Sequence, residues 1–549
     1  MRAKIKHLEL KLLLTFLIFS FWFIQWYGWN EESNFVLVRA IVEEKRFEIN
    51  SFANQTGDRS FLNSNFYSDK DPGLAFLASP IYFIWKSLYT FFPKGFKERY
   101  AGSNDHVTEL YDDTPIITLV DKGFFLFTSM ILLTFLTSGI FTALTALLIF
   151  KISRYLTKNL KERILLSLAY FFGTIAFHYS LHFMNHAIST FLSFFSFFLL
   201  FKAEKEKKER YRNFILSGIL FGFSIVVDKF LLVFLPFFIL YSLSINRKCF
   251  LLFLLFLLIS YVPYSLYTYS ILKKPFGFLS SYVDKRIFRR AYSNPQPVES
   301  SADRMLEASI LDLKTLVKMF HLEGLQPNSV IMLRLLFYPY RGLFFYSPIL
   351  ILSLFGLYFM LDEYEGETFM IFFMLLAMSA VISMRRVWWG GYCFGPRYLL
   401  PIVPFLILPL HYSFKKFGEK CFLIFLLISF SINLLGLQPA EEVAYDWNSM
   451  DISREWQAKE NTLQIIYNPL VKHYLPLTLK HGPRSGIFEH LINGYISIDI
   501  RFPPLSKGVD FPFSRFHIPF LVMLPIFFLQ LLVWRNEVKM IIYGRKKGK

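Results

Sequence analysis

The chain has 549 residues, of which 54% are hydrophobic, and its formal net charge is +18. Its mean hydropathy is +0.40. A soluble protein of this length would divide into domains with charged surfaces, whereas here continuous apolar runs recur along the whole chain. The fold class we predict is therefore an all-α polytopic membrane protein. The runs do not alternate as barrel strands do, and the positive charge lies in short stubs between them, so neither a membrane β-barrel nor a nucleic-acid partner is indicated.

The N-terminal segment combines basic residues with a long apolar run that ends near Trp29. It has no small-residue cleavage pattern, so we expect an uncleaved membrane anchor. The cysteines are Cys249, Cys393 and Cys421, and none of them pair at metal-like spacing. The sequence therefore predicts neither a disulfide framework nor a zinc site.

Twelve apolar segments are candidate membrane spans. They are 11–29, 123–150, 163–181, 187–202, 212–227, 229–245, 249–270, 343–361, 368–384, 398–413, 421–437 and 516–534. With the N-terminus inside, this count puts the main Lys/Arg clusters in the cytoplasm, as the positive-inside rule requires. Counting 73–92 as a further span would place most of them outside. We therefore expect 73–92 to be a helix at the outer interface, held by Trp85 and Tyr89.

Long polar segments then gather on the outer side. They are 30–122, 271–342 and 438–515. The predicted organisation is a transmembrane domain over 1–437 that includes the outer loop 30–122, an outer cap over 438–515, and a last span with a basic cytoplasmic tail over 516–549. The topology indicates a multi-pass protein of the bacterial inner membrane, with its site facing the periplasm.

The first outer loop carries acids at its start. Glu31 and Glu32 follow the first span directly, where a carboxylate can act as a general base. The same position suits a solvated helix N-terminus, because acids there complement the helix dipole. The spacing of apolar residues over 33–44 predicts a short helix on the membrane surface.

The densest group of charges in this loop is the stretch Asn65-Phe-Tyr67-Ser-Asp69-Lys70-Asp-Pro-Gly73. Lys70 can offer a point charge to a phosphate, and the neighbouring aspartates can orient it or bind a divalent metal. Pro72 and Gly73 are expected to start the interface helix. An ordinary charged turn is the alternative.

Three histidines, His178, His182 and His186, are spaced i, i+4, i+8, so one helical face could carry all three. No acid nearby in the sequence completes a metal-ligand set, so we interpret them as interface histidines and do not predict a metal site. We retain His186 as a candidate contact for a lipid headgroup.

Two later segments put arginine beside aromatics and Gly-Pro breaks at the outer mouth of a span. Arg341 and Arg397 would be planar donors for phosphate. Trp388 and Trp389 suit the interfacial aromatic belt, and Trp389 also suits stacking on a sugar ring.

This ordered set resembles the GT-C-fold membrane glycosyltransferases, the superfamily of the protein O-mannosyltransferases and the aminoarabinose transferases. Members place an acid after the first span, which Glu31 matches, and then a Tyr-x-x-Lys-Pro-Pro-Gly-like stretch, which Tyr67–Gly73 matches with Asp71 in place of the first proline. Lys70 matches the lysine that contacts the lipid phosphate. The segments Arg341-Gly-Leu343 and Gly395-Pro-Arg397-Tyr398 are similar to motifs of other bacterial members.

The resemblance implies sugar transfer from a polyprenyl-phosphate-linked donor to an acceptor on the outer face, which could be a glycan, a lipid or a protein. A carboxylate takes or orients the acceptor proton, with Glu31 first and Glu32, Asp58 and Asp69 as alternatives. Tyr67, Lys70, His186, Arg341, Trp389 and Arg397 are the expected substrate-binding residues. Some members use a divalent metal and others do not, and the sequence shows no ligand set for one.

Two other functions compete with this interpretation. A ligase or polymerase of lipid-linked glycans would share the spans and the outer arginines. A transporter or flippase would need ionisable residues near mid-bilayer, for which Asp228 and Lys229 are the prominent candidates, and they fall at the predicted outer boundary.

Overall fold

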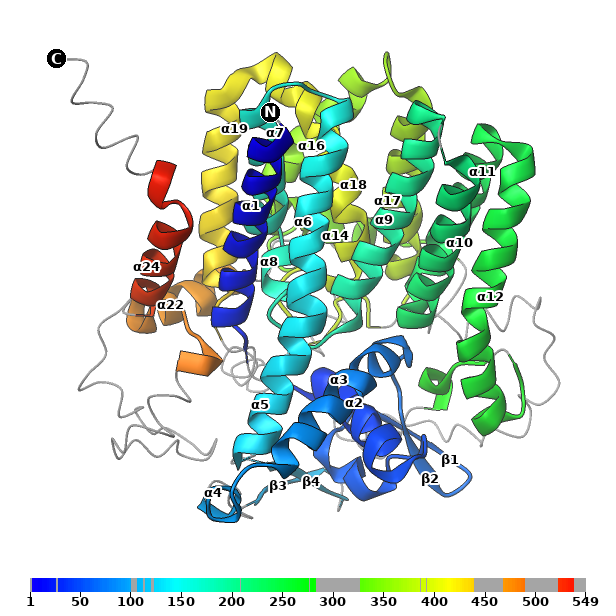
Figure 1. The fold of residues 1–549 in the computed structure, drawn as a ribbon, viewed down its shortest axis with the longest axis vertical. Coiled ribbons are helices and arrows are strands. Elements are labelled where there is room, and N and C mark those ends of the chain that lie inside the picture. Colours follow the sequence, from blue (N-terminus) through cyan, green and yellow to red (C-terminus); the bar gives the residue numbers. More distant parts are fainter. Residues whose placement is uncertain are drawn as a thin grey trace.

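The computed structural model describes residues 2–25, 28–99, 106–111, 114–119, 123–207, 209–275, 277–282, 326–385, 387–391, 393–438, 468–488 and 522–537. A bundle of long helices forms one part, and a smaller unit made of residues 28–99 lies across one end of it (Figure 1). We call this end the outer end and the opposite one the inner end.

Among the described residues, six helices are long and apolar enough to cross a membrane: Gly123–Tyr155, Asn185–Glu206, Arg210–Val227, Arg247–Leu272, Glu365–Ser383 and Leu410–Leu435. The chain is therefore a polytopic helical membrane protein, as predicted. The count of twelve spans remains a prediction, because several of the predicted segments form helices too short to belong to this set.

The bundle contains the following helices: α1 (Arg2–Trp22), α5 (Gly123–Thr134), α6 (Ile140–Ile152), α7 (Leu160–Gly173), α8 (Ala176–Tyr179), α9 (Asn185–Glu206), α10 (Arg210–Val227), α11 (Leu235–Ile245), α12 (Arg247–Leu272), α14 (Ser329–Phe337), α15 (Leu343–Tyr346), α16 (Ile351–Met360), α17 (Glu365–Ser383), α18 (Val403–Ile407), α19 (Leu410–Leu435), α22 (Leu475–His481) and α24 (Met523–Val533). A π-helical turn, Phe135–Gly139, joins α5 to α6. Short 3-10 helices precede α11 and α18, at Lys229–Phe234 and Arg397–Ile402.

The outer unit begins with α2 (Trp29–Arg39) and its π-helical extension Ala40–Glu44. A 3-10 helix (Asn50–Gln55) leads into the hairpin of β1 (Arg59–Leu62) and β2 (Asn65–Ser68), and then come α3 (Gly73–Thr90) and α4 (Lys94–Arg99). A second antiparallel pair, β3 (His106–Tyr111) and β4 (Thr114–Leu119), follows.

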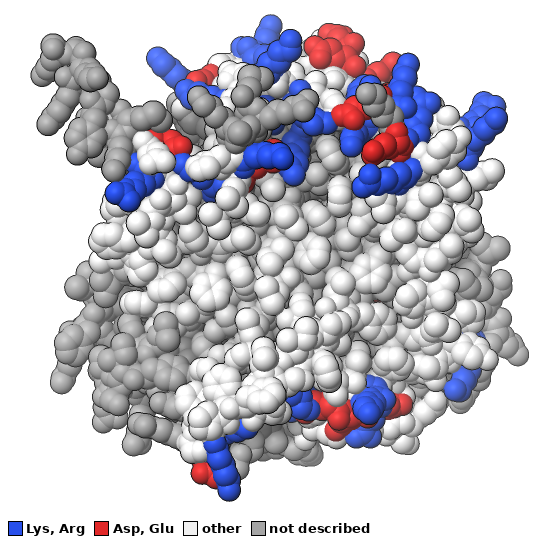
Figure 2. Space-filling view, in the orientation of Figure 1, with Lys and Arg blue, Asp and Glu red and all other residues white. Residues whose placement is uncertain are grey.

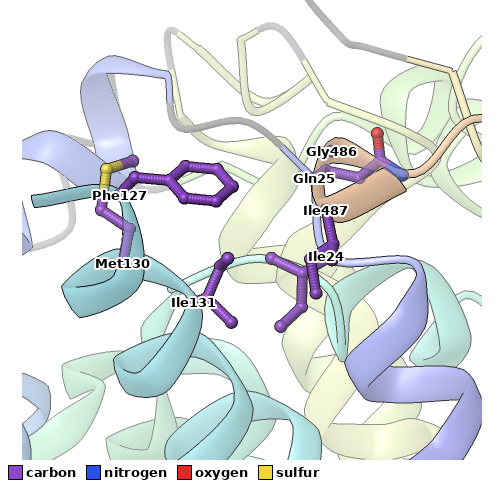
Figure 3. A pocket seen from close by; sticks show the side chains of 7 residues that line it. All are labelled: Ile24, Gln25, Phe127, Met130, Ile131, Gly486 and Ile487. Carbon is purple, nitrogen blue, oxygen red and sulfur yellow. The ribbon is translucent and has the colours of Figure 1, made fainter. Parts of the chain in front are cut away.

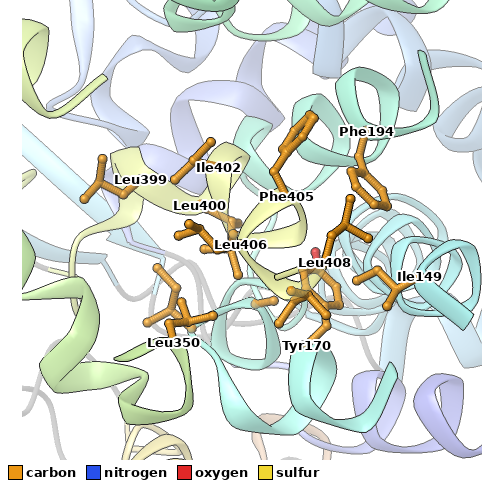
Figure 4. Close-up of a cluster of buried hydrophobic side chains, with 14 of the residues drawn as sticks. Ile149, Tyr170, Phe194, Leu350, Leu399, Leu400, Ile402, Phe405, Leu406 and Leu408 are labelled. Carbon is orange, nitrogen blue, oxygen red and sulfur yellow. The ribbon is translucent and has the colours of Figure 1, made fainter. Parts of the chain in front are cut away.

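The core of the bundle is continuous and rich in phenylalanine. Figure 4 shows one part of it, where Phe194 of α9, Tyr170 of α7 and Phe405 of α18 pack with leucines and isoleucines from the segment 399–408. Phe194 and Phe405 meet edge-on at 5.1 Å between ring centroids. Edge-to-face rings add to the burial of apolar area, so this cluster holds α9 against the 397–407 segment that carries Arg397.

Charged side chains gather at the two ends of the bundle, and a broad band between them shows none on the visible face (Figure 2). The inner end carries cross-helix ion pairs such as Lys161–Glu419 and Arg154–Glu206. An uncharged band of this kind fits the hydrocarbon core of a bilayer.

The predicted interface helix exists and begins at Gly73, directly after Pro72. α3 packs on α2 below the bundle (Figure 1) and is not one of the six long apolar helices. Phe83, Ile84 and Phe91 are 60%, 59% and 84% exposed, so one side of α3 is apolar and uncovered. That arrangement is typical of a helix lying in a membrane interface.

Two predictions about local structure differ from the structure. The first helix ends at Trp22 and not near residue 29, because the chain breaks before α2. The helix expected on the membrane surface at 33–44 is buried instead, with four consecutive residues from Phe35 to Val38 inaccessible, since α3 covers it. A break between the predicted spans 398–413 and 421–437 is present, at Gly418 (φ 80°, ψ 168°) within α19.

Several predictions lie largely outside the described residues. They concern most of the cap at 438–515, the greater part of the outer segment 271–342, and the basic tail after residue 537. Cys249, Cys393 and Cys421 are described, and all three are free thiols.

Candidate functional site

A tight hairpin brings the charged stretch back toward α2. Its two turn residues, Asn63 and Ser64, have φ values of 49° and 62°. Two successive left-handed residues make the type of turn that matches the twist of antiparallel strands. The register pairs Arg59 with Ser68 at the open end of the hairpin, so Asp58 and Asp69 emerge side by side.

Lys70 bridges these two aspartates. Its Nζ lies 2.8 Å from Asp58 Oδ2 and 2.9 Å from Asp69 Oδ1. The Lys70 side chain is 17% exposed, and the aspartates are 24% and 15% exposed. We call these three residues the Lys70 cluster. These three side chains are mostly buried, but each keeps some exposure to solvent through which a ligand could reach it.

The ionisation of the cluster follows from this contact. Burial on its own would lower the pKa of Lys70, but the carboxylates of Asp58 and Asp69 outweigh it and raise the pKa above the ordinary lysine value, against a smaller opposing effect of nearby Arg397. Burial raises the pKa of Asp69, and the charge of Lys70 opposes that rise. Lys70 is therefore a permanent cation at physiological pH.

The first turn of α2 touches the same cluster. The Ser33 hydroxyl lies 2.8 Å from Ser68 Oγ and 3.3 Å from Asp69 Oδ1. Glu31 stands two residues earlier on α2, and its Oε1 accepts a hydrogen bond at 2.8 Å from His182 Nδ1. α2 therefore contacts both the Lys70 cluster, through Ser33, and His182, through Glu31.

Both oxygens of Glu31 are engaged. Oε2 accepts a hydrogen bond from the Gly28 backbone N–H at 3.2 Å, which caps the start of α2. The side chains of Glu31 and His182 are only 4% and 5% exposed. Glu31 therefore serves the helix N-terminus and the histidine at once, and the two interpretations of this acid are not exclusive. Glu32 beside it is also buried.

Asp71 ties the outer loop to the bundle. Its Oδ2 accepts the Lys229 backbone N–H at 3.1 Å, and its Oδ1 lies 3.7 Å from Lys229 Nζ. Asn185 donates both to the Asp71 carbonyl and to the Val227 carbonyl. This role explains an aspartate where the resembling family has proline, because proline could accept neither contact through its side chain.

Gly73 allows the close approach that this tie needs. A Cβ at this position would lie 2.6 Å from the Cα and from the backbone nitrogen of Val227, closer than real contacts allow. Only glycine lets the start of α3 rest on the last turn of α10. The sequence order Asp71-Pro72-Gly73 is thus a docking element between the outer unit and the bundle.

A second carboxylate–histidine pair stands at this junction. His186 Nδ1 lies 2.8 Å from Asp228 Oδ2, and the Phe230 N–H donates to Asp228 Oδ1 at 3.1 Å. The Tyr398 ring faces the His186 ring edge-on at 5.7 Å. Asp228 is the residue after α10, so its carboxylate is at the outer end of that helix.

Arg397 lies at the start of the 3-10 helix before α18, and its charge slightly opposes the rise in the pKa of Lys70. Its Nη2 donates to the Tyr398 hydroxyl at 3.4 Å, and among the described residues its buried Nε has no hydrogen-bond partner. A Cβ on Gly390 would lie 3.2 Å from that Nε, and Gly390 has a φ of +80°. A guanidinium with a spare donor beside a glycine backbone is suited to receive an anion.

Arg341 is placed differently from the expectation. It is fully buried and donates to three backbone carbonyls, Nε to Trp389, Nη2 to Gly391 and Nη1 to Tyr340. The guanidinium therefore fixes the 389–391 turn next to Arg397. Trp389 contributes its carbonyl to this support, and its ring meets Trp388 edge-on at 5.9 Å.

Tyr67 points away from the Lys70 cluster. Its side chain is 5% exposed and packs with Tyr267 and Leu279, and its hydroxyl reaches Glu48 at 3.5 Å. It fixes the hairpin against α12. The structure does not bring the Tyr67 hydroxyl to Lys70.

The histidine prediction is wrong in one respect. The chain leaves the helical path between α8 and α9, so His178, His182 and His186 do not share one helical face. The rings of His178 and His182 lie 4.5 Å apart, while His186 pairs with Asp228. Two of these histidines do have acidic partners: Glu31 of α2 contacts His182, and Asp228 at the end of α10 contacts His186. Both acids are distant from the histidines in sequence, so residue spacing did not indicate them.

The described residues contain no group of three His, Cys, Asp or Glu side chains arranged to hold a metal ion. A small apolar hollow lies between the end of α1 and α5, lined by Ile24, Phe127 and Ile131 among others (Figure 3). None of the predicted site residues line it.

Sequence reasoning missed three contributors: His182, Asp228 as the partner of His186, and Ser33. The sequence did indicate Asp228, because it forms an Asp-Lys pair with Lys229 between two apolar segments, and ionisable residues in such positions are often functional. Nothing in residue spacing connects Glu31 to His182 or Ser33 to Asp69, since those pairs form only when α2 docks.

No known protein family matches the chain, and neither does any curated protein.

Proposed function

We propose that the protein is a membrane glycosyltransferase that moves a sugar from a polyprenyl-phosphate donor to an acceptor at the outer end of the bundle, on the periplasmic side of a bacterial inner membrane. The observation that carries the proposal is the Lys70 cluster, in which a lysine is held at 2.8 and 2.9 Å by two carboxylates beside α2, the helix that also carries the buried acid Glu31.

The electrostatics favour an anionic ligand that arrives with its own hydrocarbon chain. Lys70 supplies a permanent cation and Arg397 supplies a donor without a partner among the described residues, and together they can hold a phosphate by charge-assisted hydrogen bonds. The exposed apolar side chains of α3 lie further along the helix that starts at this junction, and they offer a surface for lipid. A phosphate on a prenyl chain fits both features.

In the proposed reaction the bond between the anomeric carbon and the phosphate oxygen breaks, and its electron pair leaves on the phosphate. Lys70 and Arg397 stabilise this charge as it grows, which is the kind of interaction that lowers a barrier most. Before the donor arrives, Asp58 and Asp69 hold the Lys70 ammonium in place. When Lys70 binds the phosphate, its contacts with these two acids weaken.

Turnover by the purified full-length chain tests the proposal. Polyprenyl-phosphate mannose, glucose, galactose and arabinose are supplied one at a time, with isolated cell envelopes as the source of acceptor, and released polyprenyl phosphate is measured. We expect release with at least one donor, and a loss of about 100-fold or more in Lys70→Met, because one preorganised charge at the reacting centre contributes that much.

Lys94→Met is the matched control, since Lys94 is a 91% exposed lysine of the same outer unit and forms only a long ion pair with Glu98. Its turnover should equal that of the wild type. Equal turnover in Lys70→Met and the wild type would refute the site, and no release from any donor would refute the function.

A further inference from the structure

The second carboxylate–histidine pair has the arrangement of an acid–base catalyst. Asp228 accepts from the Phe230 N–H through one oxygen and holds His186 Nδ1 at 2.8 Å through the other. A histidine whose Nδ1 is bonded to a carboxylate carries its proton there, which leaves Nε2 with a free lone pair. The carboxylate also stabilises the imidazolium that forms when Nε2 takes a proton.

The surroundings of the two outer histidine pairs differ. In the Glu31–His182 pair, Nε2 of the histidine is buried without a partner among the described residues, and both carboxylate oxygens are occupied. In the Asp228–His186 pair, the histidine side chain is 11% exposed, against 5% for His182. Of the two histidines, His186 is therefore the more accessible to an acceptor.

His186 is also close to the groups that would hold the donor. Its ring is 5.7 Å from Tyr398, whose hydroxyl accepts a hydrogen bond from Arg397. Asp228 precedes Lys229, which binds Asp71, and Asp71 follows Lys70 in the chain. The imidazole therefore stands at the same junction as the proposed phosphate-binding cations.

We infer that His186, oriented by Asp228, is the general base that takes the proton of the acceptor hydroxyl. This inference rests on the proposed function. The acceptor O–H proton passes to His186 Nε2 as the acceptor oxygen bonds to the anomeric carbon, and the carbon–phosphate oxygen bond breaks with its electron pair leaving on the phosphate. Asp228 is a positioning residue, and so is Glu31, which holds His182.

His186→Gln tests the inference, because glutamine is a neutral side chain of similar size that cannot take up a proton. Proton transfer by a positioned base contributes about 100- to 10,000-fold, so we expect kcat to fall by at least about 100-fold while KM for the donor and the melting temperature change little. Asp228→Asn should also lower kcat, because an amide facing Nδ1 shifts the proton to Nε2.

His411→Gln is the matched control. His411 forms the same kind of pair with Glu162, but at the start of α7, the opposite end of that helix from the outer histidines. The same substitution there removes a buried imidazole of equal size, and we expect turnover per folded molecule to remain that of the wild type.

Added imidazole separates a chemical role from a structural one. It should restore part of the turnover of His186→Ala and none of that of Lys70→Met. Turnover of His186→Gln within a few-fold of the wild type, or no rescue of His186→Ala, would overturn the inference while leaving the proposed function intact. A wild-type protein that releases no polyprenyl phosphate from any donor would overturn both.

Discussion

Lys70 and Arg341 show how a residue's partners decide its role more than its type does. Both are cations that the sequence indicates as candidate phosphate ligands. Lys70 is held by two side-chain carboxylates that can be exchanged for a ligand. Arg341 is held by three backbone carbonyls that cannot move without unfolding the turn they belong to. We therefore assign ligand binding to Lys70 and structural support to Arg341.

The Lys70 cluster predicts a pH dependence of stability. The folded-state pKa of Lys70 is raised above its ordinary value of 10.5. Burial lowers this pKa, but the negative charges of Asp58 and Asp69 raise it by more. The protonated lysine therefore stabilises the fold fully below pH 10.5, and this contribution is lost as the pH rises through the folded-state value. Melting temperatures measured from neutral pH to beyond 10.5 should fall more steeply in the wild type than in Lys70→Met. Parallel curves for the two proteins would show that the cluster does not contribute.

Single residues of the site were partly predictable. Ionisable residues beside a bilayer are costly and are often functional, so the sequence pointed to Glu31, Asp58, Asp69, Lys70 and His186. Their partners could not be predicted, because Glu31 meets His182 across 151 positions of the chain and His186 meets Asp228 across 42. Sequence spacing carries no information about contacts that depend on how two helices dock.

At the scale of elements, the contact of α3 with α10 positions the site. Asp71, Pro72 and Gly73 form the link, and the Lys70 cluster immediately precedes it. The residue pattern predicted that α3 exists and where it begins. It could not show that α3 rests on the end of α10. The only feature of the sequence that reflects this close backbone approach is Gly73, and a glycine alone does not identify the helix that it contacts.

Gly73→Ala tests this contact. Its Cβ would lie 2.6 Å from two backbone atoms of Val227, so α3 must shift. Overpacking of this kind costs about 1–3 kcal/mol, and we expect a lower melting temperature together with reduced turnover.

Gly95→Ala is the control, because a Cβ at Gly95 in α4 meets nothing within 4 Å. It should leave stability unchanged or raise it by up to about 1 kcal/mol, since alanine favours a helix over glycine. If Gly73→Ala were as stable and as active as Gly95→Ala, the docking account would be wrong.

For the molecule as a whole, hydropathy predicted the class of fold. The charge of the loops predicted which segments lie at the inner end of the bundle and which at the outer end. The apolar runs become the helices of the bundle, and the ion pairs of the inner end arise from the stubs between them. The exact lengths could not be predicted, because the first helix ends at Trp22 and the chain departs from α-helix within 174–184 and 396–402, inside or at the edge of segments expected to be single spans.

These breaks have a common consequence. Those at 23–28 and 174–184 put Glu31 on a separate helix and His182 between two helices, and the third puts Arg397 at the start of a 3-10 turn. Side chains at helix ends can converge, whereas those along parallel helices remain spread over the length of the bundle. The site therefore exists because the helices stop short at the outer end.

We propose that the outer junction binds a polyprenyl phosphate through Lys70 and Arg397. Binding of undecaprenyl phosphate to the purified chain in lipid nanodiscs tests it directly and needs no knowledge of the sugar. Undecaprenol, which has the same chain without the phosphate, is the control ligand. We predict that the phosphate binds at least about tenfold more tightly than the alcohol, since a charge-assisted phosphate contact contributes roughly 1.5–3 kcal/mol, and that Lys70→Met abolishes the difference. Equal binding of phosphate and alcohol, or the same preference in Lys70→Met as in the wild type, would contradict the account.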